Sequence, residues 1–332
     1  MEFKLSPKEN YIRYLSGEVP EYIPSMLDGH GGRVAEDLLT PQACPNGPIV
    51  TTLGVKYVGS ADLNNGAMPA PGEYVVTDIL KWRDQLKIPD FSDFDFEDYY
   101  AKKTKGVDLE HKYITFSNGD YFLTLVSLMG FEDAMLALYE EPEEVKAMLD
   151  YISDFYLLVQ KMQTKYVHPD GLMLMDDDAA YRAPFFSVEM YHEFFKPYHK
   201  KHCDLALENG MFIERHDCGK CEQFIPDWVE MGISNWNPAQ TTNDLVGIKK
   251  KWGRKLGIAG GWDNVKWGQV YDEEELRAGM VEYVETFAPG GGFSFSVMGA
   301  MGDDPKVKRR TQFIHDFYFD YVQPYYKNHG IS

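Results

Sequence analysis

Residues 171–219 read GLMLMDDDAAYRAPFFSVEMYHEFFKPYHKKHCDLALENGMFIERHDCG, and this stretch decides the fold. The short apolar run Gly171–Met175 ends in three aspartates, and a second apolar run ends at His216. Between them, Ser187 is suited to cap a helix that continues to Gly210, and glycine often terminates a helix. Two short apolar strands joined by a helix are typical of one unit of a parallel sheet.

The same alternation continues on both sides of this unit. Upstream, Pro142 is suited to open a helix, and apolar residues recur at helical spacing from there to Met162. Five units in the second half of the chain leave room for three before them, so the sequence predicts a closed (β/α)8 barrel, the TIM-barrel fold. The remaining predicted elements are helices over residues 224–231, 245–252, 273–287 and 305–321 and strands over residues 22–27, 113–116, 233–236, 255–259 and 292–297.

The length of 332 residues suits this α/β fold as a single domain spanning residues 1–332. A doubly wound sheet is the alternative architecture, but no Gly-rich dinucleotide fingerprint supports it. The first third of the chain is rich in Gly, Pro and Asn, as in NNGAMPAPGEY at residues 64–74, and is expected to form an irregular extension. This extension is either a surface segment or a cap over the barrel mouth.

The composition limits which partners and which cellular compartment we expect for this protein. The formal net charge of −19 disfavours nucleic acid and anionic membranes as partners, because both attract clustered positive charge. The amino-terminal residues lack the apolar core of a signal peptide, and no apolar run is long enough to cross a membrane, so we expect a cytoplasmic protein. Two of the four cysteines, Cys218 and Cys221, lie close to His216, which favours metal or redox chemistry over a disulfide framework.

The motif ERHDCG, residues 214–219, ends a predicted strand, where barrel enzymes gather their reactive groups. Because side chains alternate along a strand, Glu214, His216 and Cys218 are expected to point to the same side. An imidazole and a thiolate two residues apart form a natural chelate for zinc. Gly219 lets the chain turn sharply after the site, and Cys221 adds a second thiol. The alternative is a core histidine beside a small buried cysteine.

Asp176, Asp177 and Asp178 follow directly after another predicted strand. Three adjacent acids repel one another, so burial is expected to raise the pKa of at least one carboxyl group. Such a group suits a general acid, or a side chain that grips a cationic or hydroxylated substrate. The alternative is a solvated loop in which one aspartate caps a helix. Because a strand end in a barrel opens into the cleft, we expect catalytic groups among these three residues.

Other polar or flexible residues are expected near the barrel mouth. His30, within DGHGGR, follows the first predicted strand, and its neighbouring glycines permit close approach of a ligand to the backbone. Asn237 and Gln240 are suited to hydrogen-bond a substrate, or else to hold loops together. Met298 follows the last predicted strand and is expected to line the substrate site. Three further histidines of the helix after residue 187 are expected on its outer face: His192, His199 and His202.

The run EMGISNWNPAQTTNDLVGIKKKWGRKLGIAGGWDN, residues 230–264, resembles the uroporphyrinogen decarboxylase superfamily. The resemblance extends to LSPKENYIRYLSGEVPEYIP at residues 5–24, LMGFEDAMLALYEEPEEV at 128–145 and PGGGFSFS at 289–296, so it covers nearly the whole chain. It also covers the Asp pair before FFSVEMYHEFFKPY. The residues that match the central pattern are Gly232, Asn237, Pro238, Gln240, Asp244, Gly253, Lys255, Leu256, Gly260, Gly261 and Asp263.

One departure from that family concerns the substrate. The decarboxylases carry an Arg-rich segment near the amino terminus that binds propionates, whereas SMLDGHGGR stands here at residues 25–33. Porphyrinogen decarboxylation is therefore disfavoured. The HxCG motif instead resembles the zinc-dependent methyltransferases of the superfamily, which exchange methyl groups with cobalamin carried by a corrinoid protein. The resemblance thus implies a zinc ion, a corrinoid protein as partner and, since relatives are often dimeric, a homodimer.

The methyltransferases divide by substrate, and a second departure separates the groups. Those that methylate thiols such as coenzyme M have a third cysteine ligand at the last strand, but FSFSVMGAMGDD at residues 293–304 has none. Glu214, Cys221 or one of the three aspartates is then left to complete the ligand set. The resemblance therefore implies O-demethylation, in which the methyl group of an aryl methyl ether passes to cob(I)alamin. A methylcobalamin:thiol methyltransferase, a cofactor-free decarboxylase and a non-enzymatic corrinoid-binding protein are the alternatives.

Overall fold

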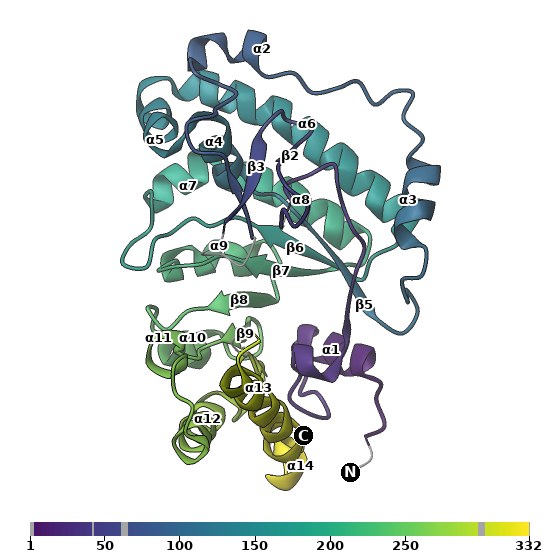
Figure 1. Cartoon of the computed structure of the whole chain (residues 1–332), viewed down its shortest axis with the longest axis vertical. Helices are drawn as coiled ribbons and strands as arrows, with labels where there is room; N and C mark the ends of the chain where they lie inside the picture. The colour runs from purple at the N-terminus through teal and green to yellow at the C-terminus, as the bar shows by residue number, and fades with distance from the viewer. Residues whose placement is uncertain (1–2, 42, 61–65, 298–302, 332) are drawn as a thin grey trace.

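The computed structural model describes residues 3–41, 43–60, 66–297 and 303–331, and its main feature is a curved parallel sheet (Figure 1). The described residues form seven parallel strands in this sheet. Their spatial order follows the chain: β1 (Gly31–Arg33), β5 (Tyr113–Asn118), β6 (Gly171–Met175), β7 (Phe212–His216), β8 (Asn235–Ala239), β9 (Gly257–Gly260) and β10 (Phe293–Ser294). This confirms the predicted α/β, TIM-barrel-like fold.

Helices pack around the sheet and bury their apolar faces against it. Figure 1 shows α6, α7 and α8 on one side of the strands and α10, α12 and α13 on the other. In α6, Pro142 is the first residue, and Val145, Met148 and Ile152 are fully buried, as the helical spacing predicted. The helices that follow or flank the strands are α4 (Tyr121–Met129), α5 (Phe131–Glu140), α6 (Pro142–Val167), α7 (Val188–Phe194), α8 (Lys196–Glu208), α9 (Ile225–Glu230), α10 (Leu245–Trp252), α11 (Asn264–Trp267), α12 (Glu273–Phe287), α13 (Pro305–Phe317) and α14 (Tyr325–Asn328).

The strand predicted over residues 22–27 is wrong. The segment instead ends in a 3-10 turn, η1 (Met26–Asp28), in which the Ser25 side chain accepts a hydrogen bond from the N–H of Leu27. A serine cap of this kind competes with extended pairing, and Pro24 has no N–H to offer a neighbouring strand. The segment still lies beside β10, because the N–H of Phe295 donates to the Pro24 carbonyl at 2.9 Å. It therefore bridges the two edges of the sheet without forming a strand.

Helix α1 (Pro7–Leu15) closes the amino-terminal end of the sheet. It begins with a capping box between Ser6 and Glu9. Its buried Tyr11 packs edge-on against Tyr113, the first residue of β5, with ring centroids 5.0 Å apart. The Tyr14 hydroxyl donates to the side chain of Asn235 at 2.7 Å. Two tyrosine side chains from α1 thus plug this end of the barrel and reach into its interior.

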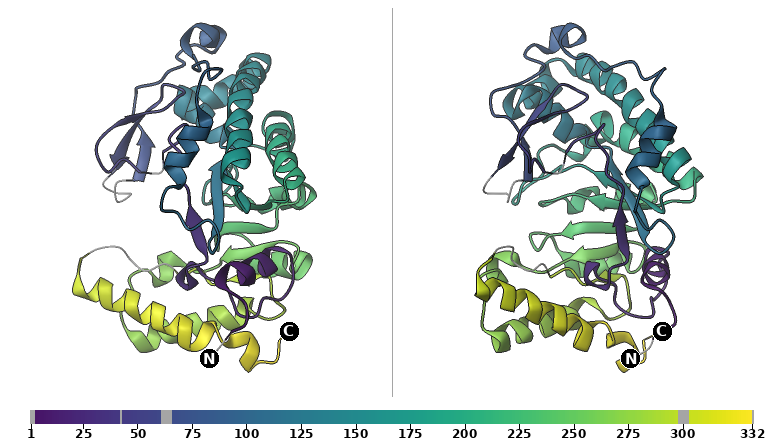
Figure 2. Two further views of the ribbon diagram at one scale, coloured as in Figure 1. Left: turned by 90° about the vertical axis from the view of Figure 1, so that its right-hand side faces the viewer. Right: turned by 45° about the vertical axis from the view of Figure 1, so that its right-hand side comes forward.

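The irregular first third carries a small antiparallel sheet of β2 (Ile49–Val50), β3 (Lys56–Ser60) and β4 (Gly66–Pro69), followed by α2 (Trp82–Gln85) and α3 (Phe96–Thr104). Figure 2 shows the small sheet beside the helices that follow β5 and β6, away from α10 and α12. The Tyr57 hydroxyl lies 3.1 Å from Ser127 Oγ of α4, and Thr40 Oγ1 donates to Asp120 at 2.7 Å. Since Asp120 follows β5, the extension covers the carboxyl-terminal side of the barrel.

The helix predicted from Ser187 to Gly210 is interrupted. Helices α7 and α8 meet at Phe195, because Pro197 has no N–H to continue the first helix. The two parts are oriented so that His199 and His202 are fully buried, and the prediction that they lie on the outer face is therefore wrong. Each accepts or donates two side-chain or carbonyl hydrogen bonds inside the core, which is why a polar ring is tolerated there. His192 is exposed, as predicted.

Among the described residues, no single helix is both long enough and apolar enough to cross a membrane. The pair Tyr121–Met129 and Phe131–Glu140 is long and apolar enough only when taken together, and it bends by 109° at the break between its two parts.

Candidate metal centre and adjoining cavity

Asp177, His216 and Cys218 gather at the carboxyl ends of β6 and β7. One potential ligand atom from each lies within 4.8 Å of the other two. His216 Nε2 is 3.8 Å from Cys218 Sγ and 3.9 Å from Asp177 Oδ1. All three side chains are half-buried, so the cluster is reachable from the barrel mouth. Strand alternation places His216 and Cys218 on one side, as predicted, and the pairing of Met175 with His216 brings Asp177 opposite.

The loop after β7 holds this arrangement through one glycine and two amide side chains. Gly219 has φ +86°, and a Cβ atom at this position would lie 2.3 Å from the Ala179 carbonyl oxygen. The sharp turn predicted at Gly219 is therefore present and requires glycine. The Gly219 N–H donates to Gln240 Oε1 at 2.9 Å, and His216 Nδ1 lies 3.2 Å from Asn237 Oδ1. In this structure Gln240 fixes a loop, and Asn237 orients the imidazole.

The three side chains fit a zinc ion by their chemistry. Burial raises the pKa of the Cys218 thiol, and the neighbouring Asp177 carboxylate raises it further. A divalent cation between these groups reverses that effect, because it favours the thiolate and attracts the carboxylate. Oxygen, nitrogen and sulfur donors suit zinc, and three protein ligands leave the fourth position of a catalytic zinc site open. These three residues would therefore suffice for a catalytic zinc ion without a cysteine at the last strand.

Two further residues predicted as metal ligands, Glu214 and Cys221, lie outside the cluster. Glu214 points to the same side as His216 but is buried deeper, where Tyr11 and Asn235 donate to its carboxylate at 2.5 and 2.7 Å. Cys221 is fully buried at the start of the next helical turn, with its Sγ 3.6 Å from the Gly219 carbonyl oxygen. The structure therefore brings together only part of the predicted ligand set.

The three consecutive aspartates have three different environments. Asp176 is fully buried and accepts hydrogen bonds from the N–H groups of Phe122 and Leu123, at 2.8 and 2.9 Å, so it caps the start of α4. Asp178 is also fully buried. Burial raises the pKa of Asp176 to about 7 and that of Asp178 to about 6. The expected rise in pKa is present, with burial rather than mutual repulsion as its main cause. Of the three aspartates, only Asp177 belongs to the cluster with His216 and Cys218.

Arg215 is a buried residue of the site that sequence reasoning missed. Its guanidinium donates to Asp178 at 2.5 Å and to Asp217 at 2.8 Å, and it lies 5.4 Å above the Trp228 ring. Asp217 in turn accepts a hydrogen bond from the N–H of Asp178 at 3.0 Å. This ion network joins the loops after β6 and β7 from behind the cluster. The sequence does contain a sign of this role. Arg215 is charged, yet strand alternation turns its side chain toward the helices that cover the sheet.

A cavity of about 340 Å³ adjoins the cluster inside the barrel. This volume lies at the lower end of the range for small-molecule sites, about 300–1,000 Å³. Asn237 contributes to the wall of the cavity and also contacts His216, so the cavity and the cluster lie on either side of this residue. His30, a predicted substrate-binding residue, also lines it, whereas Met298 lies outside the described residues. The other lining residues are Tyr11, Met26, Gly31, Gly32, Arg33, Tyr113, Thr115, Met173 and Glu214.

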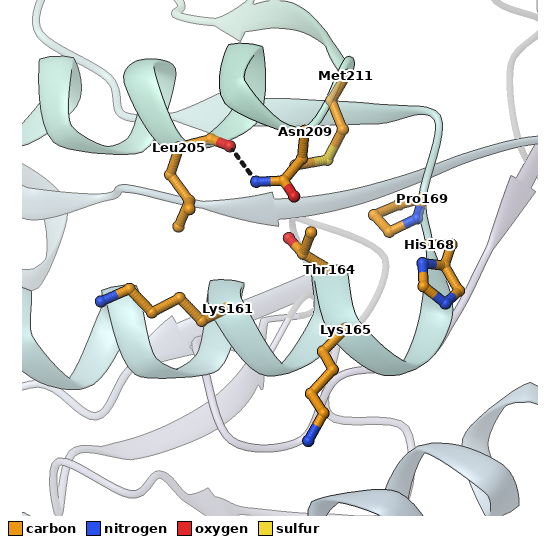
Figure 3. Close-up of a pocket in the computed structure, with 8 residues that line it drawn as sticks. All are labelled: Lys161, Thr164, Lys165, His168, Pro169, Leu205, Asn209 and Met211. Carbon is orange, nitrogen blue, oxygen red and sulfur yellow. Dashed lines mark hydrogen bonds between the residues drawn. The ribbon is translucent and has the colours of Figure 1, made fainter.

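A larger pocket, about 490 Å³, lies elsewhere (Figure 3). It sits between the carboxyl ends of α6 and α8, where Asn209 Nδ2 donates to the Leu205 carbonyl at 2.8 Å. Pro169 and Met211, which line it, lie two residues before β6 and one residue before β7. The pocket is therefore at the amino-terminal face of the sheet, whereas active sites of barrel enzymes lie at the carboxyl-terminal face.

Comparisons with known proteins agree with this architecture. The sequence pattern of the family described as uroporphyrinogen decarboxylase (URO-D) matches residues 76–297. Among solved structures, a methyltransferase from Methanosarcina mazei aligns over 95% of this chain and 100% of that chain, with a TM-score of 0.64 and 12% sequence identity. At this identity the likeness shows a shared fold. No curated protein sequence matches significantly.

Proposed function

The chain belongs to the uroporphyrinogen decarboxylase family, and from this premise we propose that it is a methyltransferase that moves a methyl group from an aryl methyl ether to the cob(I)alamin of a separate corrinoid protein. The observation that carries the proposal is the cluster of Asp177, His216 and Cys218 at the carboxyl ends of β6 and β7, beside a cavity of about 340 Å³ in the barrel interior. A metal-binding trio next to a cavity for a small molecule is the arrangement that metal-assisted cleavage of an ether requires.

Asp177, His216 and Cys218 would hold a zinc ion in this proposal. When bound, zinc supplies Lewis acidity that lowers the basicity of the departing phenolate. Asn237 accepts a hydrogen bond from His216 Nδ1–H, which leaves Nε2, the nitrogen nearer Cys218, as the ligand atom. Because a ligand thiol must stay reduced, the cytoplasm is the compartment in which we place the reaction.

The walls of the cavity favour an aromatic substrate over a thiol such as coenzyme M. Tyr11, Met26 and Met173 line it, and methionine and aromatic side chains pack well against a flat ring. The chain has no cysteine after Cys221, so a third thiolate from the last strand is absent from the sequence. The methyltransferase of Methanosarcina mazei, which shares the fold, supports methyl transfer as the reaction class.

The proposal is tested by mixing the purified protein with a reduced corrinoid protein and a methoxyphenol. We expect the cob(I)alamin absorbance to be replaced by that of methylcobalamin. The absence of any spectral change across a panel of methoxylated aromatics would contradict the proposal. Consumption of a carboxylated substrate without metal or corrinoid would favour a decarboxylase instead.

Two cysteine variants form a matched pair that tests which thiol binds the metal. Cys218→Ser should lose both zinc and methyl transfer, whereas Cys221→Ser should keep about one zinc per chain, because Cys221 lies outside the cluster. Zinc content is measured by elemental analysis after dialysis. Equal retention in both variants would contradict this ligand assignment.

A further inference from the structure

We propose that His30 and Glu214 form the floor of the barrel cavity and recognise a free hydroxyl group at the end of the substrate remote from the metal-binding cluster. The substrate class is thereby narrowed to aryl methyl ethers that keep a phenolic hydroxyl opposite the methoxy group. This narrowing rests on the proposed function, but recognition of the hydroxyl itself does not.

His30 presents a hydrogen-bond acceptor to the cavity. Its Nδ1 lies 2.6 Å from Asp28 Oδ1 and 3.1 Å from the Ser25 carbonyl oxygen. Both partners are acceptors, so Nδ1 carries a proton, and Nε2 is the ring nitrogen left for a ligand; in our proposal Nε2 accepts the hydrogen bond of that ligand. Among the described residues nothing donates to Nε2. The ring is held in place by stacking on Tyr11, with centroids 3.8 Å apart, and its side chain is 3% exposed.

Glu214 contributes a second acceptor. Its Oε2 accepts both hydrogen bonds, from the Tyr11 hydroxyl at 2.5 Å and from Asn235 Nδ2 at 2.7 Å. No group in the described part of the chain donates to Oε1, although Glu214 is buried and lines the cavity. A ligand that donates a hydrogen bond to Oε1 therefore meets an acceptor that no described protein group uses.

The distance between floor and cluster matches a benzene ring. Glu214 and His216 lie two residues apart on the same side of β7, a separation of about 6.6 Å at the usual rise of a strand. That is close to the span of a ring substituted at opposite positions. A substrate with its ether oxygen near His216 therefore places the opposite substituent at Glu214 and His30.

The chemistry of the floor selects among substituents at that position. A hydroxyl group donates a hydrogen bond to either acceptor. A second methoxy group has no proton to donate and therefore offers a hydrogen bond to neither acceptor. A carboxylate substituent lacks a proton at neutral pH, so it also has none to donate to the two acceptors. The floor therefore favours a hydroxyl group over a methoxy group and over a carboxylate.

Ligand binding without any corrinoid tests this inference independently of methyl transfer. The zinc-loaded protein is titrated calorimetrically with 4-methoxyphenol and, separately, with 1,4-dimethoxybenzene. We expect the phenol to bind at least about tenfold more tightly, as one hydrogen bond to a charged or buried acceptor implies. Equal affinity, or preference for the diether, would overturn the inference.

Variants of His30 and Glu214 test whether these two residues cause the preference for the phenol. His30→Phe keeps a ring on Tyr11 but removes the acceptor, and Glu214→Gln replaces an acceptor with an amide of the same shape. Each should lose or reverse the preference while keeping its zinc, whereas the exposed His111→Phe and Glu189→Gln should behave as wild type. An unchanged preference in both floor variants contradicts the inference, and if either variant fails to fold, the wild-type ligand pair still decides.

The outcome also separates this inference from the proposed function. A preserved preference for the phenol without methylcobalamin formation would contradict methyl transfer alone. The converse result is that the phenol and the diether bind with equal affinity and donate their methyl groups at equal rates at subsaturating concentration. That result would contradict only recognition of the hydroxyl group.

Discussion

The carboxylate of Asp177 accepts a hydrogen bond of 2.8 Å from the backbone N–H of Cys218. This contact joins the end of β6 to the end of β7 at the point where the three potential ligands meet. Asp177 therefore has two roles in the proposed site: it offers an oxygen ligand, and it fixes the backbone that carries the thiol.

Replacement of Asp177 separates these two roles. Asp177→Asn keeps an oxygen that accepts from the Cys218 N–H but removes the negative charge, and Asp177→Ala removes both. We expect zinc affinity to fall at least about 10-fold in the first variant and further in the second. Competition with a chelating dye measures this, and the exposed Asp93→Asn serves as control. Wild-type affinity in both variants would exclude Asp177 as a ligand.

Gly219 and Gly210 form a matched pair for the turn after Cys218. Both have positive φ, +86° and +71°, but a Cβ at Gly219 would meet the Ala179 carbonyl oxygen at 2.3 Å, whereas nothing lies within 4 Å of one at Gly210. Gly210→Ala should therefore cost about 1–2 kcal/mol in unfolding free energy, the usual penalty of a left-handed alanine. Gly219→Ala should cost more and also lower zinc content. Urea denaturation and metal analysis check this, and equal effects of the two changes would contradict it.

The sequence predicted the parts of the site that depend on local periodicity. The alternation of side chains along a strand was enough to place His216 and Cys218 together, and the glycine after Cys218 predicted the turn. Which of three consecutive aspartates faces the cluster depends on the pairing of β6 with β7. That register is a tertiary property, so residue types at neighbouring positions carry no information about it.

The errors arose where polar residues are buried by partners distant in the sequence. His202 is accommodated in the core because Tyr121 and Gln160, from α4 and α6, complete its hydrogen bonds. Arg215 is accommodated by Asp178 from the neighbouring strand end. Neither partner is apparent from the spacing within one helix or strand. The strand predicted over residues 22–27 is wrong for a different reason, because Pro24 and Ser25 interrupt extended pairing within its apolar run.

Buried His202 predicts a loss of stability in mild acid. Burial lowers its pKa to about 3, well below the value of about 6.5 in the unfolded chain. The unfolded state therefore binds the proton first, and the stability that neutral His202 provides is present above pH 6.5 and lost as pH falls from there toward 3. Between about pH 7 and about pH 5 this amounts to about 2 kcal/mol.

The measurement is the difference in unfolding free energy between wild type and His202→Gln at both pH values. We expect the advantage of the wild type to shrink by about 2 kcal/mol on acidification. The same comparison for His111→Gln, whose imidazole is exposed, should show no such change. A pH-independent difference for His202→Gln would show that the ring is not held neutral.

Arg215 supports the last prediction, because two buried carboxylates, on Asp178 and Asp217, depend on its charge. Removal of one partner from a buried ion network leaves charge without compensation, which typically costs about 3–5 kcal/mol. Arg215→Met should therefore lower the unfolding free energy by that amount, measured by chemical denaturation at neutral pH. Adding Asp178→Asn and Asp217→Asn removes the stranded charge, so the triple variant should recover part of the lost stability. If Arg215→Met costs less than about 1 kcal/mol, or if the triple variant is less stable than the single one, the network does not hold the two loops in the way its geometry implies.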